Sequence, residues 1–222
     1  MALAAGLPLP AIAQWKPIRI GLLTVKTGPL AQGGIQMEQG TNLFLKDANG
    51  MMAGRKVELI VGDTGGNPAG AKTKAQELIE RDNVDLIFGP LAAFELLAIS
   101  DYVAGKKVPI LSLAAAGLYI NGMVAEAALE KVGGDTDDKE ALIRALRAVS
   151  LTDSPRGPFH FDEFGNVVGN IFIRRCEKKD GKLVNTTVKT YPNVSQFWTY
   201  DEKAFLANPV YARDYPPAKY LE

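Results

Sequence analysis

The sequence has little of the chemistry on which most enzymes depend, because its 222 residues include one cysteine and one histidine. The single Cys176 excludes an internal disulfide framework and any cysteine-based zinc site. The single His160 leaves little from which a histidine metal centre or a serine–histidine–aspartate triad could be built. We expect His160 to be a structural strand residue and Cys176 a packed apolar one. We predict neither a cofactor nor a metal site.

The sequence also lacks an excess of either charge and lacks long apolar runs. Its 25 basic residues balance its 25 acidic ones, so no net field favours nucleic acid or an anionic membrane. No segment approaches the roughly 20 consecutive apolar residues that a membrane-spanning helix needs. A hydrophobic fraction of 47% and a charged fraction of 23% are typical of a globular protein. We therefore expect a soluble protein with no nucleic-acid partner.

The first 13 residues differ in composition from the rest. Residues 3–13 are small and apolar, and Ala11-Ile12-Ala13 before Gln14 fits the pattern of a signal-peptidase site. The first basic residue, Lys16, lies beyond that site, so the positive start of a signal peptide is absent. We interpret residues 1–13 as a signal-peptide remnant, with an ordinary apolar tail as the alternative. The protein is then exported, and its mature chain is expected to begin at Gln14.

Residues 17–116 alternate short apolar runs with segments of helical periodicity. The expected strands are residues 18–23, 57–63, 85–88 and 108–113. The expected helices are residues 35–48, a segment that starts at Asn67-Pro68, and residues 94–103. Four strands alternating with helices predict an α/β fold with a doubly wound parallel sheet and right-handed crossovers.

From Gly117 onward the alternation stops. Apolar stripes predict a pair of helices, one around residues 120–128 and one from Asp137 to Val149. The pattern after Pro155 then turns to β structure. A β-hairpin is expected, with strands at residues 167–175 and 182–191. The aromatic and proline-rich tail of residues 196–222 predicts an irregular strap.

The chain is accordingly divided into three parts. They are the remnant 1–13, an α/β lobe over residues 14–150, and a C-terminal region over residues 151–222 with the β-hairpin and the tail.

Ligands of doubly wound sheets bind outside the carboxyl ends of the strands. The glycine-rich loop of residues 28–34 runs there into a helix N-terminus, where free backbone N–H groups and the helix dipole suit a carboxylate. The alternative for this loop is a plain turn between strand and helix. We expect Asp63, at the end of the next strand, to bond its own loop rather than a metal.

A phosphate-binding site is a weaker hypothesis than a carboxylate-binding one. Residues 65–73 come within one residue of the pattern GxxxxGK[ST]. The extra Ala71 rotates Lys72 by about 100° around the helix, and Pro68 removes one N–H donor.

Several longer stretches are specific enough to indicate a family. "IRIGLLTVKTGPLAQGG", "GRKVELIVGDTGGNPAGAKTKAQELIERDNVDLIFGP" and "VPILSLAAA" closely resemble the first lobe of type I periplasmic solute-binding proteins. These are the branched-chain amino acid-binding type, which feed ABC importers. "LYINGMVAEAALEKVGG" and "PRGPFHFDEFGNVVG" resemble the end of the same family. The nearest likeness is to members that carry aromatic acids of the hydroxycinnamate type.

The resemblance implies two α/β lobes that close around a ligand, a periplasmic location and a membrane permease as partner. In this sequence, however, residues 112–116 run straight into Gly117-Leu118-Tyr119, which resembles the family's C-terminal part. The units of the second lobe that should intervene are missing. We therefore predict an internally deleted, essentially one-lobed binding protein, whether engineered or produced by a deletion in the gene.

The resemblance also implies where a ligand would bind. In amino acid-binding relatives, hydroxyls after the third and fourth strands hold the ligand's charged groups, whereas alanines stand in the matching stretches here. This change favours an aromatic acid over a branched-chain amino acid. We expect the neighbouring Glu95 to face solvent, with a role as ligand for an ammonium group as the alternative. The predicted ligand-binding half-site consists of Leu30, Gln32, Leu91, Ala92, Ala93, Phe94, Ala114 and Ala115.

The leading hypothesis is thus a non-enzymatic, exported module that binds aromatic acids or related small carboxylates. The second hypothesis is a ligand-free scaffold, because half a cleft need not bind anything. The third is an enzyme of flavodoxin-like fold, which the lack of a nucleophile–base pair disfavours. A homodimer is also expected, since a missing lobe uncovers apolar loop ends and leaves a sheet with an unfinished edge.

Overall fold

The computed structural model describes residues 15–112 and 118–207. The predicted signal-peptide remnant, Ala114, Ala115 and the end of the tail lie outside the described residues. The chain divides into two compact units. Unit 1 comprises the residues up to Gly122 together with residues 133–139, and unit 2 comprises residues 123–132 together with those from Glu140 onward.

Unit 1 is built on a five-stranded sheet with the order β2-β3-β1-β4-β5. Its strands are β1 (Ile18–Thr24), β2 (Met51–Met52), β3 (Arg55–Asp63), β4 (Leu86–Phe88) and β5 (Ile110–Leu111). Four of these strands run parallel, which confirms the predicted parallel sheet. The fifth strand, β2, pairs antiparallel with β3; it was not predicted, because two residues display no periodicity.

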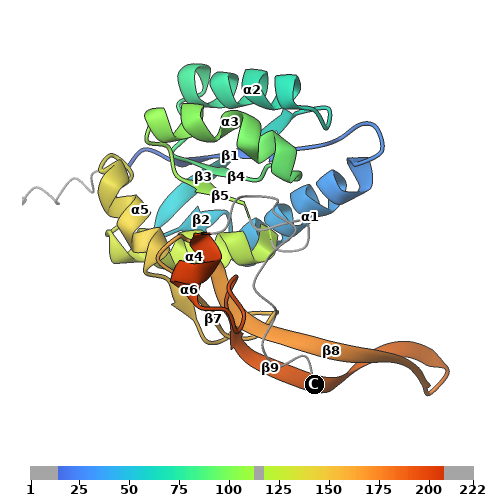
Figure 1. Ribbon diagram of the computed structural model, residues 1–222. Coiled ribbons are helices and arrows are strands. Elements are labelled where there is room, and N and C mark those ends of the chain that lie inside the picture. The colour runs from blue at the N-terminus through green and yellow to red at the C-terminus, as the bar shows by residue number, and fades with distance from the viewer. Residues whose placement is uncertain (1–14, 113–117, 208–222) are drawn as a thin grey trace, which may run out of the picture. The chain divides into compact units, whose positions relative to one another are not determined.

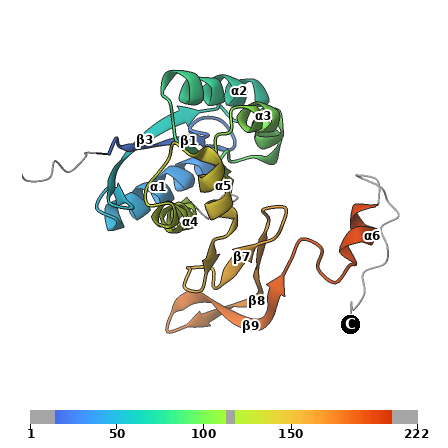
Figure 2. The same ribbon diagram turned by 90° about the vertical axis from the view of Figure 1, so that its left-hand side faces the viewer.

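Helices lie on both faces of this sheet, so the double winding is confirmed (Figures 1 and 2). Helices α2 and α3 cover one face and α1 covers the other. The helical elements of unit 1 are α1 (Ala31–Asp47), α2 (Pro68–Gln76), the π-helical turn η1 (Glu77–Arg81), α3 (Ala93–Gly105) and the start of α4 (Leu118–Lys131). Among the described residues, no helix is long and apolar enough to cross a membrane.

The central strand β1 supplies core side chains to both faces of the sheet. Leu23 packs with α2 and α3 in a cluster that also contains Leu78 and Ile99. Ile20 and Leu22, which alternate with it along the strand, are fully buried. A strand covered on both sides reads as a continuous apolar run, which is why this strand was predictable.

Glycines let α1 approach its neighbours closely. A Cβ atom on Gly34 would lie 1.9 Å from the carbonyl oxygen of Val25, just beyond the end of β1. A Cβ atom on Gly122 of α4 would lie 2.3 Å from the ring of Phe44 on α1. Both distances are far below van der Waals contact, so these positions require glycine.

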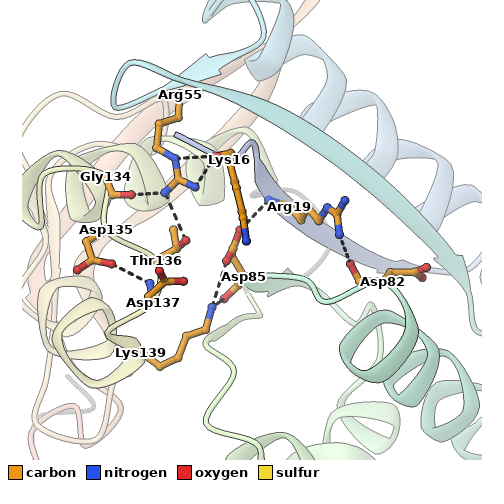
Figure 3. A network of polar contacts seen from close by, with 10 residues as sticks. All are labelled: Lys16, Arg19, Arg55, Asp82, Asp85, Gly134, Asp135, Thr136, Asp137 and Lys139. Atoms are coloured by element: carbon orange, nitrogen blue, oxygen red, sulfur yellow. Dashed lines mark hydrogen bonds and ion pairs between the residues drawn. The ribbon is translucent and has the colours of Figure 1, made fainter. Parts of the chain in front are cut away.

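A polar network joins the amino ends of the strands to residues 133–139 (Figure 3). The guanidinium of Arg55, which is 7% exposed, donates hydrogen bonds to the carbonyl oxygens of Lys16 and Gly134. The Lys139 ammonium lies 3.2 Å from the carboxylate of Asp85. The network therefore holds the segment 133–139 at the edge opposite the carboxyl ends of the strands.

Unit 2 contains a four-stranded antiparallel sheet in the order β6-β7-β8-β9, together with most of α5 and with α6. These elements are α5 (Lys139–Arg147), β6 (Ser150–Leu151), β7 (Phe159–Phe161), β8 (Val167–Lys179), β9 (Lys182–Val194) and α6 (Glu202–Leu206). The predicted helical pair and the predicted hairpin are present, and His160 lies on a strand as expected. Our predicted boundary lies between residues 150 and 151. The division into two units instead assigns most of α4 and most of α5 to unit 2.

Two expectations for the C-terminal region are wrong. Cys176 is exposed rather than packed, because its part of β8 has no layer of structure over it among the described residues. The tail is not entirely irregular, because α6 forms within it. The carboxylate of Asp201 accepts a hydrogen bond from the backbone N–H of Ala204 at 2.9 Å, which caps this helix.

Candidate functional site

The carboxyl ends of the parallel strands meet at one edge of unit 1. The register places Thr24 at the end of β1 beside Asp63 at the end of β3, and Phe88 of β4 beside Leu111 of β5. Three loops follow these strands, and we call residues 25–30, 64–67 and 89–92 the carboxyl-end loops. An edge of this kind is where doubly wound sheets bind ligands.

Asp63 joins two of the carboxyl-end loops. One of its carboxylate oxygens accepts hydrogen bonds from the backbone N–H groups of Lys26, at 2.9 Å, and Gly65, at 3.0 Å. The expectation that Asp63 bonds its own loop is therefore confirmed. No group of three histidine, cysteine or acidic side chains among residues 15–112 and 118–207 is placed to hold a metal ion.

Backbone N–H groups in and just after the loop before α2 are already hydrogen-bonded to side chains of that loop. The Gly66 N–H donates to the hydroxyl of Thr64 at 3.2 Å, and the Gly70 N–H donates to the side-chain oxygen of Asn67 at 2.9 Å. The predicted cap at Asn67, with Pro68 in the first turn, is thus confirmed. A phosphate would have to displace these contacts, which weakens the phosphate-binding hypothesis further.

The carboxylate of Glu95 is fully buried, so the expectation that it faces solvent is wrong. It accepts a hydrogen bond from the backbone N–H of Ala92 at 3.1 Å and another from the hydroxyl of Thr64. An acidic side chain in the first turn of a helix commonly folds back onto the residue before it. The start of α3 is therefore already occupied by an acidic side chain, and Glu95 ties the loop after β4 to the loop after β3.

The start of α1 differs from those of α2 and α3. Leu30 at its N-cap makes no side-chain hydrogen bond, and its first turn contains no acidic residue. Gln32 in this turn is exposed. No acidic side chain of its own first turn therefore offsets the partial positive charge of this helix start, so a carboxylate can approach it favourably.

The structure brings predicted site residues from different loops to this edge. Leu91 is half-buried and lies against Gly33, where a Cβ atom would come within 3.1 Å of its side chain. Leu30 lies against Gly66 in the same way, at 3.7 Å. The other predicted residues that are described lie at the N-cap of α3 or in the first turns of α1 and α3: Ala92, Gln32, Ala93 and Phe94.

Sequence reasoning missed two positioning residues, Thr24 and Thr64. Both are buried. The Thr24 hydroxyl donates to the carbonyl oxygen of Gly34 at 2.7 Å and so holds α1 against the end of β1. The Thr64 backbone N–H donates to the carbonyl oxygen of Thr24 at 2.8 Å. A hydroxyl at or just past the end of an expected strand was the available signal, but nothing local shows where such a hydroxyl bonds.

Comparison with known families and proteins agrees with this geometry. Residues 17–117 match the family model described as periplasmic binding protein. A Leu/Ile/Val-binding protein of Rhizobium johnstonii is 30% identical over 93 residues, which are 41% of this chain and 25% of that protein. The match therefore spans about a quarter of the length of that curated relative.

Solved structures show the same fold. An ABC transporter substrate-binding protein from Sphaerobacter thermophilus has a TM-score of 0.74 at 19% identity, covering 80% of this chain and 98% of that one. A solute-binding protein of an ABC transporter from Rhodopseudomonas palustris, solved with 3,4-dihydroxybenzoic acid, has a TM-score of 0.73 at 17% identity. That comparison covers 81% of this chain and 98% of the other.

Proposed function

We propose that this chain is the solute-binding component of an ABC importer, because residues 17–117 match the family model described as periplasmic binding protein and 93 residues are 30% identical to a Leu/Ile/Val-binding protein. The family match carries the proposal, because residues 17–117 include the carboxyl-end loops that follow β1, β3 and β4. Its location is then the periplasm, its partner a membrane permease, and its role binding rather than catalysis.

The proposed ligands are aromatic acids or related small carboxylates. The exposed ring of Phe94 and the side chains of Leu30 and Leu91 offer apolar contacts, while the uncapped start of α1 suits a carboxylate. Ala92 and Ala93 provide no hydroxyl for the ammonium group of an amino acid. The Rhodopseudomonas palustris neighbour, solved with an aromatic acid, supports this choice, and the name of the Rhizobium relative keeps branched-chain amino acids as the second ligand class.

We further propose that an internal deletion has left the chain with one lobe. This α/β lobe spans residues 14–150, and the C-terminal region spans residues 151–222. The confinement of the family match to residues 17–117 supports this. Ala114 and Ala115 complete the proposed half-site. A ligand-free, self-associating scaffold remains the second candidate function, because the two-residue strand β5 ends the sheet of unit 1.

Replacing Phe94 by alanine should weaken the binding of an aromatic acid about tenfold, because the ring stacks on the ligand. The matched control is Leu97→Ala, which removes a 73% exposed apolar side chain from the same helix. Ligand-observed NMR titration with 4-hydroxybenzoate measures both affinities. Equal affinities of the two variants would place the ligand elsewhere.

We expect the protein to form a dimer whose interface includes the edge strand β5, since an unpaired strand edge invites pairing. A lysine in place of Ile110 should lower the dimer fraction, because a charged residue on an edge opposes pairing. Met51→Lys on the opposite edge strand, β2, serves as the control. Light scattering over a concentration series measures the mass. A strict monomer at every concentration contradicts the prediction.

A further inference from the structure

The zero net charge of the chain conceals a basic segment. Residues 167–194, which form β8, β9 and their turn, contain six basic and two acidic residues, a net charge of +4. The basic residues are Arg174, Arg175, Lys178, Lys179, Lys182 and Lys189, and the acidic ones are Glu177 and Asp180. Charge segregated in this way attracts an anionic surface locally even when the whole protein is neutral.

This segment forms a two-stranded ribbon over most of its length. Strand β7 pairs with β8 only from Val167 to Gly169, and β9 is the last strand of its sheet. Beyond residue 170 the ribbon therefore has no third strand among the described residues (Figure 1). A bare two-stranded ribbon is marginally stable in water, so a surface that covers one face would stabilise it.

The strand register assigns the side chains to the two faces of the ribbon. Ile171 pairs with Tyr191, Ile173 with Lys189, Arg175 with Thr186 and Lys179 with Lys182. Paired residues share a face, and every second residue along a strand lies on that face. We call this the outer face, and it consists of Ile171, Ile173, Arg175, Glu177, Lys179, Lys182, Val184, Thr186, Lys189 and Tyr191.

The outer face combines cations with apolar and aromatic groups. Four of its residues are basic and one is acidic, while Ile171 and Ile173 are 49% and 47% exposed. The ring of Tyr191 lies beneath the ammonium of Lys189, at 4.6 Å. Trp198 packs against Tyr191 in an edge-to-face arrangement, with ring centres 5.4 Å apart. Tyrosine and tryptophan beside lysine and small apolar groups are the composition of surfaces that lie in the headgroup region of a bilayer.

Pairing with a strand of another chain is opposed at the free edge of β9. Pro192 has no N–H to donate, and the register of β9 shifts both near Pro192 and at Val188. Prolines, bulges and lysines are the devices that keep an edge strand from pairing. These features disfavour the β9 edge as an interaction surface and leave the faces of the ribbon and the β8 edge.

We propose that the outer face docks on the anionic phospholipid surface of a membrane. The net charge of the face is three positive charges, and each contributes roughly a fivefold preference for an anionic surface. The full chain should therefore bind vesicles of phosphatidylcholine with about one third phosphatidylglycerol about a hundredfold more tightly than vesicles of phosphatidylcholine alone. Raising the ionic strength from about 0.05 M to about 0.5 M should remove most of this preference.

The test is co-sedimentation of the protein with these two kinds of vesicle. The triple variant Arg175→Glu/Lys182→Glu/Lys189→Glu should lose binding to the anionic vesicles. The control is Lys46→Glu/Lys56→Glu/Lys72→Glu, which changes the net charge equally at exposed positions of unit 1 and should still bind. Circular dichroism checks that both variants are folded.

Two further measurements complete the test. Serine at Ile171 and Ile173 should weaken binding about tenfold without changing its salt dependence. Failure of the chain to sediment with anionic vesicles, or equal loss in the two triple variants, overturns the proposal. If the outer-face variant loses a lipid-free dimer instead of vesicle binding, the face binds a second copy and the membrane assignment is wrong.

Discussion

Titration of the protein with an aromatic acid such as p-coumarate should give a dissociation constant of about 1 mM. The reason is the area that a half-site leaves uncovered. In a closed two-lobed site a ligand of this size is buried almost completely, and loss of one lobe exposes on the order of 150 Å² of its apolar surface. At about 25 cal/mol per Å², the lost burial corresponds to roughly 4 kcal/mol, or about a thousandfold in affinity from a micromolar site.

Isothermal titration calorimetry with p-coumarate and, separately, with leucine measures this affinity. The alanines after β4 should make leucine the weaker ligand, because Ala92 and Ala93 have no side-chain hydroxyl to accept a hydrogen bond from its ammonium group. One-to-one binding of either ligand in the micromolar range would contradict the half-site, or would show that a dimer completes it. Repeating the titration with the Ile110→Lys variant separates these two explanations.

Substitution of Gly34 by alanine should destabilise the protein by about 3 kcal/mol. The added Cβ atom would lie 1.9 Å from the carbonyl oxygen of Val25, and a backbone atom cannot move aside as a flexible side chain can. The first turn of α1 would have to shift away from β1, and the hydrogen bond from Thr24 to Gly34 would lengthen. The same shift would displace Leu30 and Gln32 from the proposed half-site.

Urea unfolding of the Gly34→Ala and Gly105→Ala variants measures the effect. Gly105 ends α3 and has open space around it, so alanine there should be neutral or stabilise the protein by up to about 1 kcal/mol. Both variants add one methyl group to a glycine. The difference between their free energies of unfolding therefore measures the cost of the close approach between residue 34 and Val25. Unfolding midpoints for Gly34→Ala within error of the unsubstituted protein would show that α1 does not pack against Val25 as described.

Local patterns were sufficient to predict most elements of unit 1. The run from Ile18 to Leu23 indicated β1, and Asn67-Pro68 indicated the start of α2, because the cap and the first-turn proline act on their own neighbours. The glycine-rich loop before α1 likewise led to the prediction that a ligand binds at this edge, which stays a prediction. These features depend on residues a few positions apart, and they need no knowledge of the rest of the chain.

Contacts between distant residues were decided only by the tertiary structure. Glu95 is buried because it reaches the hydroxyl of Thr64, 31 positions away, and Arg55 bonds the carbonyl oxygen of Gly134, 79 positions away. Cys176 is exposed because nothing among the described residues lies over its part of the ribbon.

The basic residues of the hairpin illustrate what the sequence determines and what only the tertiary structure determines. The sequence by itself determined that six cations lie between Arg174 and Lys189. The tertiary structure decided, through the register of β8 and β9, which of them share a face with Ile171, Ile173 and Tyr191. The physical reason is that pairing between strands sets which side chains lie together, and a bulge at Val188 shifts that pairing by one residue in a way that local propensity does not reveal.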